Sequence, residues 1–494
     1  MPKTLRVEVR RKLMKDRILY SKKFVLILFM IPALFLLYLN LFKNSYGCFN
    51  GYDLGIYGQA ILKLSSFSDL NPFVSIRGIE IFNDHFDPVI FIPAILLNLF
   101  GGGVNLLIIF EWFMFLSFLP LLLKMTNSSK QFLYLGALYF LSVGVVGALL
   151  YPIHASYWSI PIWALLAKSI VKNELKSVLL YSILLCFFKE SYPFAILGLS
   201  IGFGLIRNLR YCLSVGVVAL AFLFFIFVLR PIIFGPVYGH GEELVRNLLN
   251  NHVQFILSLV LDLNYKDFVK NWLPPFIIGL IGILNNATRR NAILLLFLTL
   301  PILGIQFLAN KFAHQYSFMW SVVWITFFAL SYKELDVGAK RKSLILIAFL
   351  IGGVKFYELG FRFLAFNKSN KCSISQARER DISEARRLTK SYSKRILATG
   401  GMSVALLDKE INIYQFCSHG DIEPEYEMLV LEKNRFGEIY PLNHKTLEDL
   451  LTKCKNFGKV KYESQGLLIL EGEFSNSRCL GYREGECSQY INQN

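Results

Sequence analysis

Long apolar segments separated by short polar links dominate the first three quarters of the chain. The first, residues 24–42, contains only apolar residues apart from Tyr38 and Asn40. A helix of about 20 apolar residues can cross the hydrocarbon core of a bilayer. The runs do not alternate with a period of two, so they predict spanning helices rather than barrel strands. About eleven spans are expected, near residues 24–42, 104–123, 131–150, 157–171, 175–189, 192–207, 210–230, 272–288, 291–309, 314–332 and 342–361.

The links between these spans predict the orientation of the chain. Nine Lys and Arg residues precede or begin the first span, and Lys or Arg also occurs in the links at 124–130, 172–176, 207–210, 285–290 and 333–342. Positive links favour the cytoplasmic side. We therefore expect residues 1–23 to be a basic cytoplasmic N-terminus, followed by a retained signal-anchor with no obvious cleavage site.

The apolar segment 88–100 is the main uncertainty in this topology. It has 13 residues, which is short for a crossing, and glycines follow it at 101–103. If it crossed, the positive links would move to the outer side. We therefore expect an interfacial or re-entrant segment within a long first outer loop, residues 43–103.

The last quarter of the chain has a different, more polar character. Its pattern predicts an amphipathic helix over 374–393, strands at 395–398, 411–416, 426–432 and 466–471, and helices near 402–407 and 445–456. An odd number of spans places this region outside. The predicted fold is an α-helical polytopic membrane protein, with a transmembrane domain over 24–367 and a small extracytoplasmic α/β domain over 368–494.

Charge and cysteine content refine this interpretation. The net charge is +17, from 52 Lys and Arg against 35 Asp and Glu. Because the basic residues cluster in the links, they favour topology and anionic lipid as the explanation, not nucleic acid. A multi-pass protein of the plasma (inner) membrane is expected. Five of eight cysteines fall in the outer region, where disulfides persist. Cys479 and Cys487 form the best candidate pair, with unpaired structural cysteines as the alternative.

The first outer loop carries the most concentrated candidate chemistry. Asp53 opens a predicted helix over 53–67, where a carboxylate can accept a proton or hold a cation, or only complement the helix dipole. Asp84 and Asp87 are three residues apart with His85 between them. On one helical turn the two acids would share a face, and their repulsion favours a bound cation or a shared proton. The alternative is a solvated cap before the next apolar helix.

Polar residues at the outer ends of later spans are further candidates. Lys189 and Glu190 end a span, where they either meet outer-leaflet phosphate or pair with each other. Arg230 could bind phosphate through two hydrogen bonds, but marking the membrane interface is the favoured interpretation. All seven histidines fall on the outer side, which favours a shared pocket: His85, His154, His240, His252, His314, His419 and His444. No GxxxxGK[ST] or HExxH motif occurs, which argues against an ATP-driven pump.

These features together resemble the C-type (GT-C) membrane glycosyltransferases. The shared features are a first span, an outer loop opening with Asp, an acid–His group before a short apolar segment, many spans and an outer domain. More closely, the chain resembles a family of predicted membrane proteins of bacteria and archaea. The shared segments are Asp-Leu-Gly-Ile-x-x-Gln at 53–59, Asp-His-Phe-x-Pro at 84–88, Lys-Glu at 189–190 and His-x-Tyr at 314–316. That family often follows Lys-Glu with Asp, where this chain has Ser191.

The resemblance implies transfer of a sugar from a polyprenyl-phosphate donor to a saccharide, lipid or protein acceptor at the outer membrane face. Asp53 would be the base, with Asp84 and His85 completing the catalytic group. Asp84 and Asp87 would hold a divalent cation, Mg²⁺ or Mn²⁺. Residues implied to bind substrate or its phosphate are Asp87, Lys189, Glu190, Arg230, Tyr57, Gln59, His154, His314 and Tyr316. The alternatives are a transporter or flippase for lipid-linked saccharides, and a non-catalytic assembly factor.

Overall fold

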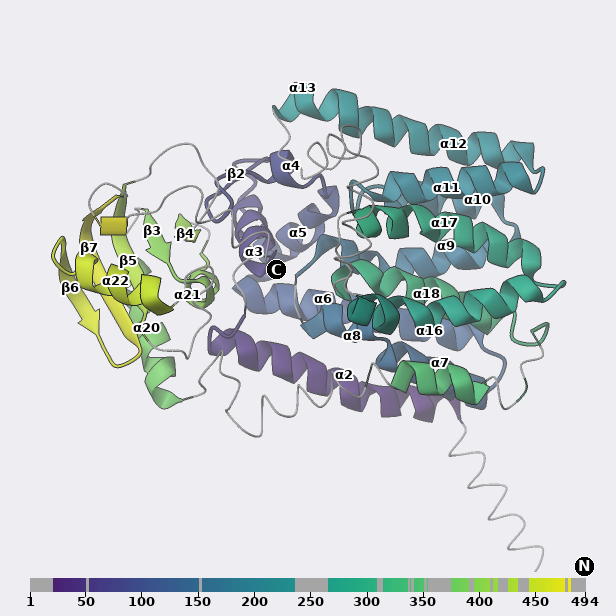
Figure 1. Ribbon diagram of the computed structural model, residues 1–494, viewed down its shortest axis with the longest axis horizontal. Coiled ribbons are helices and arrows are strands. Elements are labelled where there is room, and N and C mark those ends of the chain that lie inside the picture. Colours follow the sequence, from purple (N-terminus) through teal and green to yellow (C-terminus); the bar gives the residue numbers. More distant parts are fainter. Residues whose placement is uncertain are drawn as a thin grey trace, which may run out of the picture. The chain divides into compact units, whose positions relative to one another are not determined.

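The computed structural model describes most of the chain and divides it into two compact units (Figure 1). Unit 1 comprises Met1–Leu37, Glu111–Leu150 and Ala155–Tyr357, and unit 2 comprises Tyr38–Phe110, Tyr151–His154 and Glu358–Asn494. The described residues are 21–49, 53–150, 153–235, 265–308, 314–335, 338, 342–350, 353, 375–390, 395–408, 412–415, 425–433, 444–475 and 479–480. This division differs from the expected one, because the first outer loop belongs with the C-terminal region.

Unit 1 is built from helices whose apolar residues form a continuous core. Helix α11 packs against α12 and α17, while α18 packs against α8, α9 and α16. Five tryptophans that are almost fully enclosed fill this core: Trp158, Trp163, Trp272, Trp320 and Trp324. The elements are α7 (Ser129–Leu141), α8 (Val143–Leu150), η2 (Ala155–Ser159), α9 (Ile160–Lys172), α10 (Leu175–Leu185), α11 (Tyr192–Leu205), α12 (Leu209–Phe224), η3 (Phe225–Leu229), α13 (Arg230–Phe234), α16 (Tyr265–Leu284), α17 (Arg289–Leu308) and α18 (His314–Leu330).

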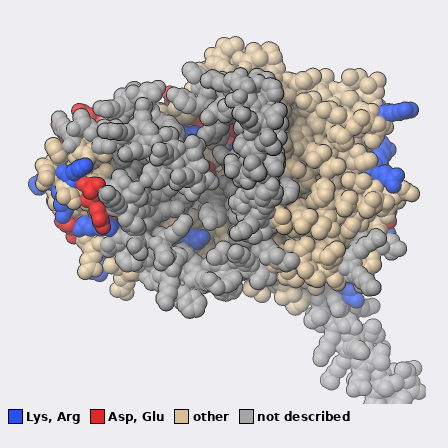
Figure 2. Space-filling view, viewed as in Figure 1, with Lys and Arg blue, Asp and Glu red and all other residues tan. Residues whose placement is uncertain are grey.

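The exposed surface of these helices is apolar, as contact with lipid requires. On α12, the exposed side chains Leu213, Val217 and Leu220 follow helical spacing, and each is more than half exposed. A water-facing helix would carry polar residues at these positions. Figure 2 shows this surface as largely uncharged, with Lys and Arg gathered at one end of the helices.

The structure supports several membrane-spanning helices without establishing eleven. In the described residues, four helical segments are long and apolar enough to cross: Lys22–Ser45 (α2), Gly103–Met125 (α6), Leu209–Phe234 and Arg289–Leu308. The bent pair α7 and α8 makes a fifth if counted as one span. Several other expected spans correspond to apolar helices of 10–17 residues, including α10 and α11. The expected span 342–361 lies mostly outside the described residues, so the number of crossings stays a prediction.

The first outer loop forms a small folded layer within unit 2. It contains α3 (Asp53–Leu64), strands β1 (Phe73–Val74) and β2 (Ile79–Glu80), α4 (Ile81–Asp84), η1 (Pro88–Ile90) and α5 (Phe91–Phe100). The Asn44 amide at the end of α2 donates to Asn105 Oδ1 at the start of α6, at 2.8 Å. This bond holds the end of one candidate span beside the start of the next. It therefore favours a loop that leaves and re-enters the membrane on one side, with η1 and α5 not crossing.

The C-terminal region contains the small α/β domain that the sequence predicts. A five-stranded mixed sheet has the order β4-β3-β5-β7-β6, with β3 parallel to β4 and β5, and β7 antiparallel to β5 and β6. Helices cover both faces, so β5 reads as a continuous apolar run. Met428 and Val430 pack toward α20 and α21, and Leu429 and Leu431 pack toward α22. The elements are α20 (Gln376–Lys390), β3 (Ile396–Ala398), α21 (Gly400–Ala405), β4 (Ile413–Gln415), β5 (Tyr426–Glu432), α22 (His444–Cys454), β6 (Gly458–Glu463) and β7 (Leu467–Phe474).

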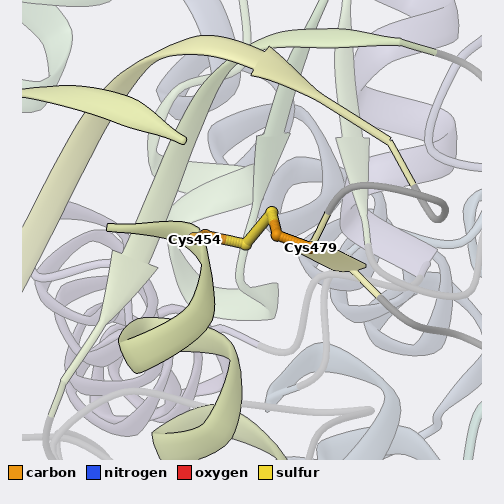
Figure 3. Close-up of a disulfide and its surroundings, with 2 residues drawn as sticks. All are labelled: Cys454 and Cys479. Atoms are coloured by element: carbon orange, nitrogen blue, oxygen red, sulfur yellow. A yellow bond between two sulfur atoms is a disulfide. The ribbon is translucent and has the colours of Figure 1, made fainter. Parts of the chain in front are cut away.

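The disulfide between described residues of this domain differs from the expected pair. Cys479 bonds Cys454 at the end of α22, with the Cα atoms 5.2 Å apart (Figure 3). Cys487, its expected partner, lies outside the described residues. Both bonded cysteines are buried in the core between α22 and the sheet. The short Cys479–Cys487 spacing suggested a local bridge, but packing of α22 brings a cysteine 25 residues earlier to the same place.

Three sets of contacts attach α3 to the C-terminal domain. Gln59 Nε2 donates to Ser75 Oγ at 2.8 Å, and Ser75 Oγ donates to the Ile413 carbonyl at 2.6 Å. Lys63 Nζ donates to Asn412 Oδ1 at 2.7 Å, and burial lowers the pKa of Lys63. At Gly58, a Cβ atom would lie 2.9 Å from Leu407 Cδ1, so the Leu407 side chain approaches α3 closely there. The C-terminal domain therefore fixes the helix that carries Asp53.

Candidate functional site

The centre of the candidate site is Asp53 at the start of α3. Most of α3 is buried, but the Asp53 side chain is 41% exposed. Its Oδ2 lies 3.0 Å from His154 Nε2, and the His154 side chain is 8% exposed. The Asp53 carboxylate is therefore partly exposed, and its Oδ2 atom contacts a mostly buried histidine. An acid in the first helical turn also complements the helix dipole, so this structural role accompanies any chemical one.

Tyr57 extends the site by one helical turn. It lies four residues after Asp53, on the same face of α3. Its hydroxyl donates to Asp87 Oδ2 at 2.5 Å, and both side chains are buried. Its ring stacks on the ring of His85, with centroids 5.8 Å apart and planes 12° apart. The sequence segments 53–59 and 84–88 therefore meet in space, as a shared site requires.

Asp84 and Asp87 do not share a helical turn, contrary to expectation. Helix α4 ends at Asp84, and His85 has an extended backbone (φ −127°, ψ 126°). Asp84 Oδ2 instead accepts from Arg77 Nε at 3.0 Å, and the Asp84 side chain is 4% exposed. Each acid therefore has its own partner, Arg77 for Asp84 and Tyr57 for Asp87. The Arg77 guanidinium offsets the charge of Asp84.

These positions divide the loop candidates into open and enclosed groups. Asp53 and His85 are partly exposed, and His85 retains 30% side-chain exposure. Asp84, Asp87 and Tyr57 are buried. Within the described part of the chain, no group of three or more His, Cys, Asp or Glu is arranged to hold a metal ion. The expected cation between Asp84 and Asp87 therefore stays a prediction.

Gln59 has a different place from the other loop candidates. Its side chain is fully buried, its amide nitrogen bonds Ser75, and its carbonyl oxygen accepts from the Ile76 backbone N–H at 3.3 Å. These contacts favour a structural role for Gln59. Its carboxamide satisfies backbone and hydroxyl groups that would otherwise be buried without partners.

The candidates in unit 1 belong to other elements. Between α10 and α11, Lys189 Nζ lies 4.0 Å from Glu190 Oε1, so the mutual ion pair considered from the sequence is present. Arg230 begins α13 and is only 2% exposed. Its burial tests neither phosphate binding nor a place at the membrane interface, so both stay predictions. Glu111, an acid within α6, is fully buried and accepts from Trp158 Nε1 at 3.2 Å.

Several predictions concern residues or side chains that the structure does not describe. His314 and Tyr316 lie in α18, but their side chains are not described. His240, His252 and His419 also lie outside the described residues.

Sequence reasoning missed Arg77 as a member of the site. It lies in the turn between β1 and β2, residues 75–78, and this turn brings Arg77 to Asp84, seven residues later. The available signal was a basic residue between the acids Asp69 and Asp84 of the same loop. The sequence also did not show that Tyr57 binds Asp87, because that bond depends on how α3 and η1 pack.

Comparisons with known proteins give one clear relationship. Two crystal structures of ArnT from Cupriavidus metallidurans, one bound to undecaprenyl phosphate and one in the apo state, are similar to this chain at 11% and 12% sequence identity. Each alignment covers 90% of this chain and 97% of that chain, with a TM-score of 0.48. No curated protein matches the sequence. The family model described as "Predicted membrane protein (DUF2079)" matches residues 48–397, which include the whole first-loop site. This chain therefore belongs to the DUF2079 family of predicted membrane proteins.

Proposed function

We propose that this protein is a GT-C-type membrane glycosyltransferase that moves a sugar from a polyprenyl-phosphate donor to an acceptor hydroxyl. The observation that carries the proposal is the half-open Asp53 carboxylate backed by His154. Segment 53–59, which begins with Asp53, and segment 84–88 carry the resemblance to the GT-C glycosyltransferases. In the proposed topology the loop and the C-terminal domain lie on the outer side of the plasma (inner) membrane.

In the proposed reaction, the acceptor oxygen attacks the anomeric carbon of the donor sugar. The bond between that carbon and the phosphate oxygen breaks, and polyprenyl phosphate leaves. Asp53 takes the acceptor proton, because it is the exposed member of the pair, whereas His154 is enclosed and orients it. His85 is the other exposed loop residue and would contact the bound substrate. Asp84 and Asp87 would position these groups through Arg77 and Tyr57.

A phosphate leaving group needs its negative charge stabilised more than it needs a strong acid. Lys189 supplies an ammonium group with 16% exposure, and Arg230 supplies a buried guanidinium. Mg²⁺ or Mn²⁺ bound by Asp84 or Asp87 is the alternative source of positive charge. His314, Tyr316 and Glu190 remain candidates for substrate contact.

The test is transfer from a polyprenyl-phosphate sugar in membranes containing Asp53→Asn. The control is Asp69→Asn, since Asp69 is an exposed acid of the same loop whose side chain accepts from the Asn71 backbone N–H. We expect loss of about a hundredfold or more for Asp53→Asn and little change for the control. Unchanged transfer in Asp53→Asn would remove Asp53 from the mechanism. If Asp53→Asn has no effect while removal of residues 368–494 abolishes function, the result would instead favour an assembly factor.

A further inference from the structure

A second pocket in unit 2 has the chemistry of an anion site. Its volume is about 230 Å³. It is lined by the end of α2, the start of α6, the last turns of α20 and the segment after α21. None of the residues around Asp53 lines it. Leu407 lines the pocket, and a Cβ atom added at Gly58 on α3 would lie 2.9 Å from its Cδ1, so the Leu407 side chain also approaches that helix.

The charged residues of this pocket favour a negatively charged ligand. Arg386 and Lys390 are four residues apart on α20, so they lie on the same face of that helix. Arg386 Nε donates to the Ala405 carbonyl at 2.9 Å, which fixes the guanidinium against the wall, and burial lowers the pKa of Arg386. Asp408 is the one acidic lining residue in the described part of the chain. Two cations against one anion leave a net positive lining.

Polar neutral groups add suitable donors. Asn44 and Asn105 line the pocket and are held together by the bond from Asn44 Nδ2 to Asn105 Oδ1. Because that bond uses the Asn105 oxygen, the Asn105 side-chain nitrogen remains oriented as a donor. Thr389 contributes a hydroxyl-bearing side chain to the same lining.

The position of the pocket indicates where its ligand comes from. Asn44 lies at the end of α2 and Asn105 in the first turn of α6, and both helices are long and apolar enough to span a membrane. Their ends mark one membrane surface, where lipid phosphate groups lie. Basic side chains at this level attract anionic lipid headgroups.

We propose that this pocket binds a phosphate group at the membrane surface through Arg386, Lys390 and Asn105. The group belongs either to an anionic lipid headgroup or to a free phosphate compound. The site does not depend on the proposed transfer reaction, and its test measures binding alone.

Isothermal titration of the full chain in neutral detergent tests the proposal. One arm uses short-chain phosphatidylglycerol and the other uses inorganic phosphate. The informative variant is Asn105→Asp, which keeps an acceptor for Asn44 and places an acid in the first turn of α6, where a helix favours it. Its added charge should weaken binding by about tenfold or more. Lys390→Gln should also weaken binding, whereas Lys459→Gln, on the exposed strand β6, should not.

The outcomes distinguish a site for the phosphate group, a site for a lipid headgroup and the absence of a site. Saturable binding of both probes, weakened in the two pocket variants, would identify the phosphate group itself as the ligand. Binding of the lipid alone, weakened in the same way, would identify a headgroup site. Absence of saturable binding of either probe would overturn the proposal, as would equal affinity of wild type, Asn105→Asp and Lys390→Gln.

Discussion

Arg378 offers a sharp test of how the C-terminal domain holds the candidate site. It lies near the start of α20, and its guanidinium has three partners within unit 2. Nε donates to the Tyr46 carbonyl at 2.6 Å, one terminal nitrogen donates to the Gly47 carbonyl at 3.2 Å, and the other lies 2.6 Å from Glu432 Oε1. The Arg378 side chain is 7% exposed and that of Glu432 is 1% exposed. Arg378 therefore links the sheet to the chain six residues before Asp53.

Replacing Arg378 with Met should be strongly destabilising. The change leaves the Glu432 carboxylate buried without its cation, which costs about 3–5 kcal/mol in comparable buried pairs. It also removes two hydrogen bonds to backbone carbonyls, which adds about 1 kcal/mol each if the carbonyls stay dry. Glu432 keeps only its hydrogen bond from Thr399 Oγ1, at 3.2 Å.

The matched control is Arg387→Met on the same helix. Arg387 also forms an ion pair, with Glu384 at 2.8 Å, but its side chain is 68% exposed. Solvent screens such a pair, so its loss should cost less than about 1 kcal/mol. The double variant Arg378→Met with Glu432→Gln should recover most of the lost stability, because no uncompensated charge remains buried.

Pulse proteolysis of the purified chain in denaturant measures these differences through survival of the C-terminal domain. We expect Arg378→Met to shift its unfolding to markedly lower denaturant, and Arg387→Met to leave it almost unchanged. Equal resistance of the two single variants would refute the reasoning. A double variant as unstable as Arg378→Met would show that the buried charge is not the cause.

Further experiments test the role of Lys189, the need for a divalent cation and the contribution of the Cys454–Cys479 disulfide to stability. Lys189→Gln should lower transfer by about a hundredfold if its ammonium stabilises the leaving phosphate; Lys172→Gln, at the exposed end of α9, should not, and equal rates would exclude that role. If a divalent cation held by Asp84 or Asp87 stabilises the leaving phosphate instead of Lys189 or Arg230, chelation should abolish transfer and Mg²⁺ or Mn²⁺ should restore it. Full activity in chelator would exclude an essential cation. Cys454→Ser should lower the free energy of unfolding of the C-terminal domain by about 3 kcal/mol, from loss of a 25-residue loop. Unchanged protease resistance in that variant would contradict this.

In the C-terminal domain, the hydrophobic pattern predicts a buried strand well and an exposed edge strand poorly. The segment 426–432, with the apolar run 428–431 at its centre, predicted β5 with the bounds that the structure has, because both faces of that run are buried. Strand β6 was missed. Its residues Gly458–Glu463 are mostly exposed and polar, and it is recognisable only from its pairing with β7 at the sheet edge.

The candidate site divides in the same way between local and long-range features. Asp53 could be placed at a helix start from sequence, since the glycine before it and the helical pattern after it are local signals. The partners could not be placed, because His154 is 101 residues away and Tyr57 and Asp87 are 30 apart. Tertiary packing decides such contacts, and a single sequence carries no direct record of it.

A structure of the protein with a non-hydrolysable polyprenyl-phosphate sugar analogue tests the central claim most directly. The account predicts that the anomeric carbon of the analogue lies beside the exposed Asp53 carboxylate, with room for an acceptor hydroxyl between them. His154 should still contact the far side of that carboxylate. An analogue bound in a channel through the helices of unit 1, with its sugar away from Asp53, would contradict the account and favour transport.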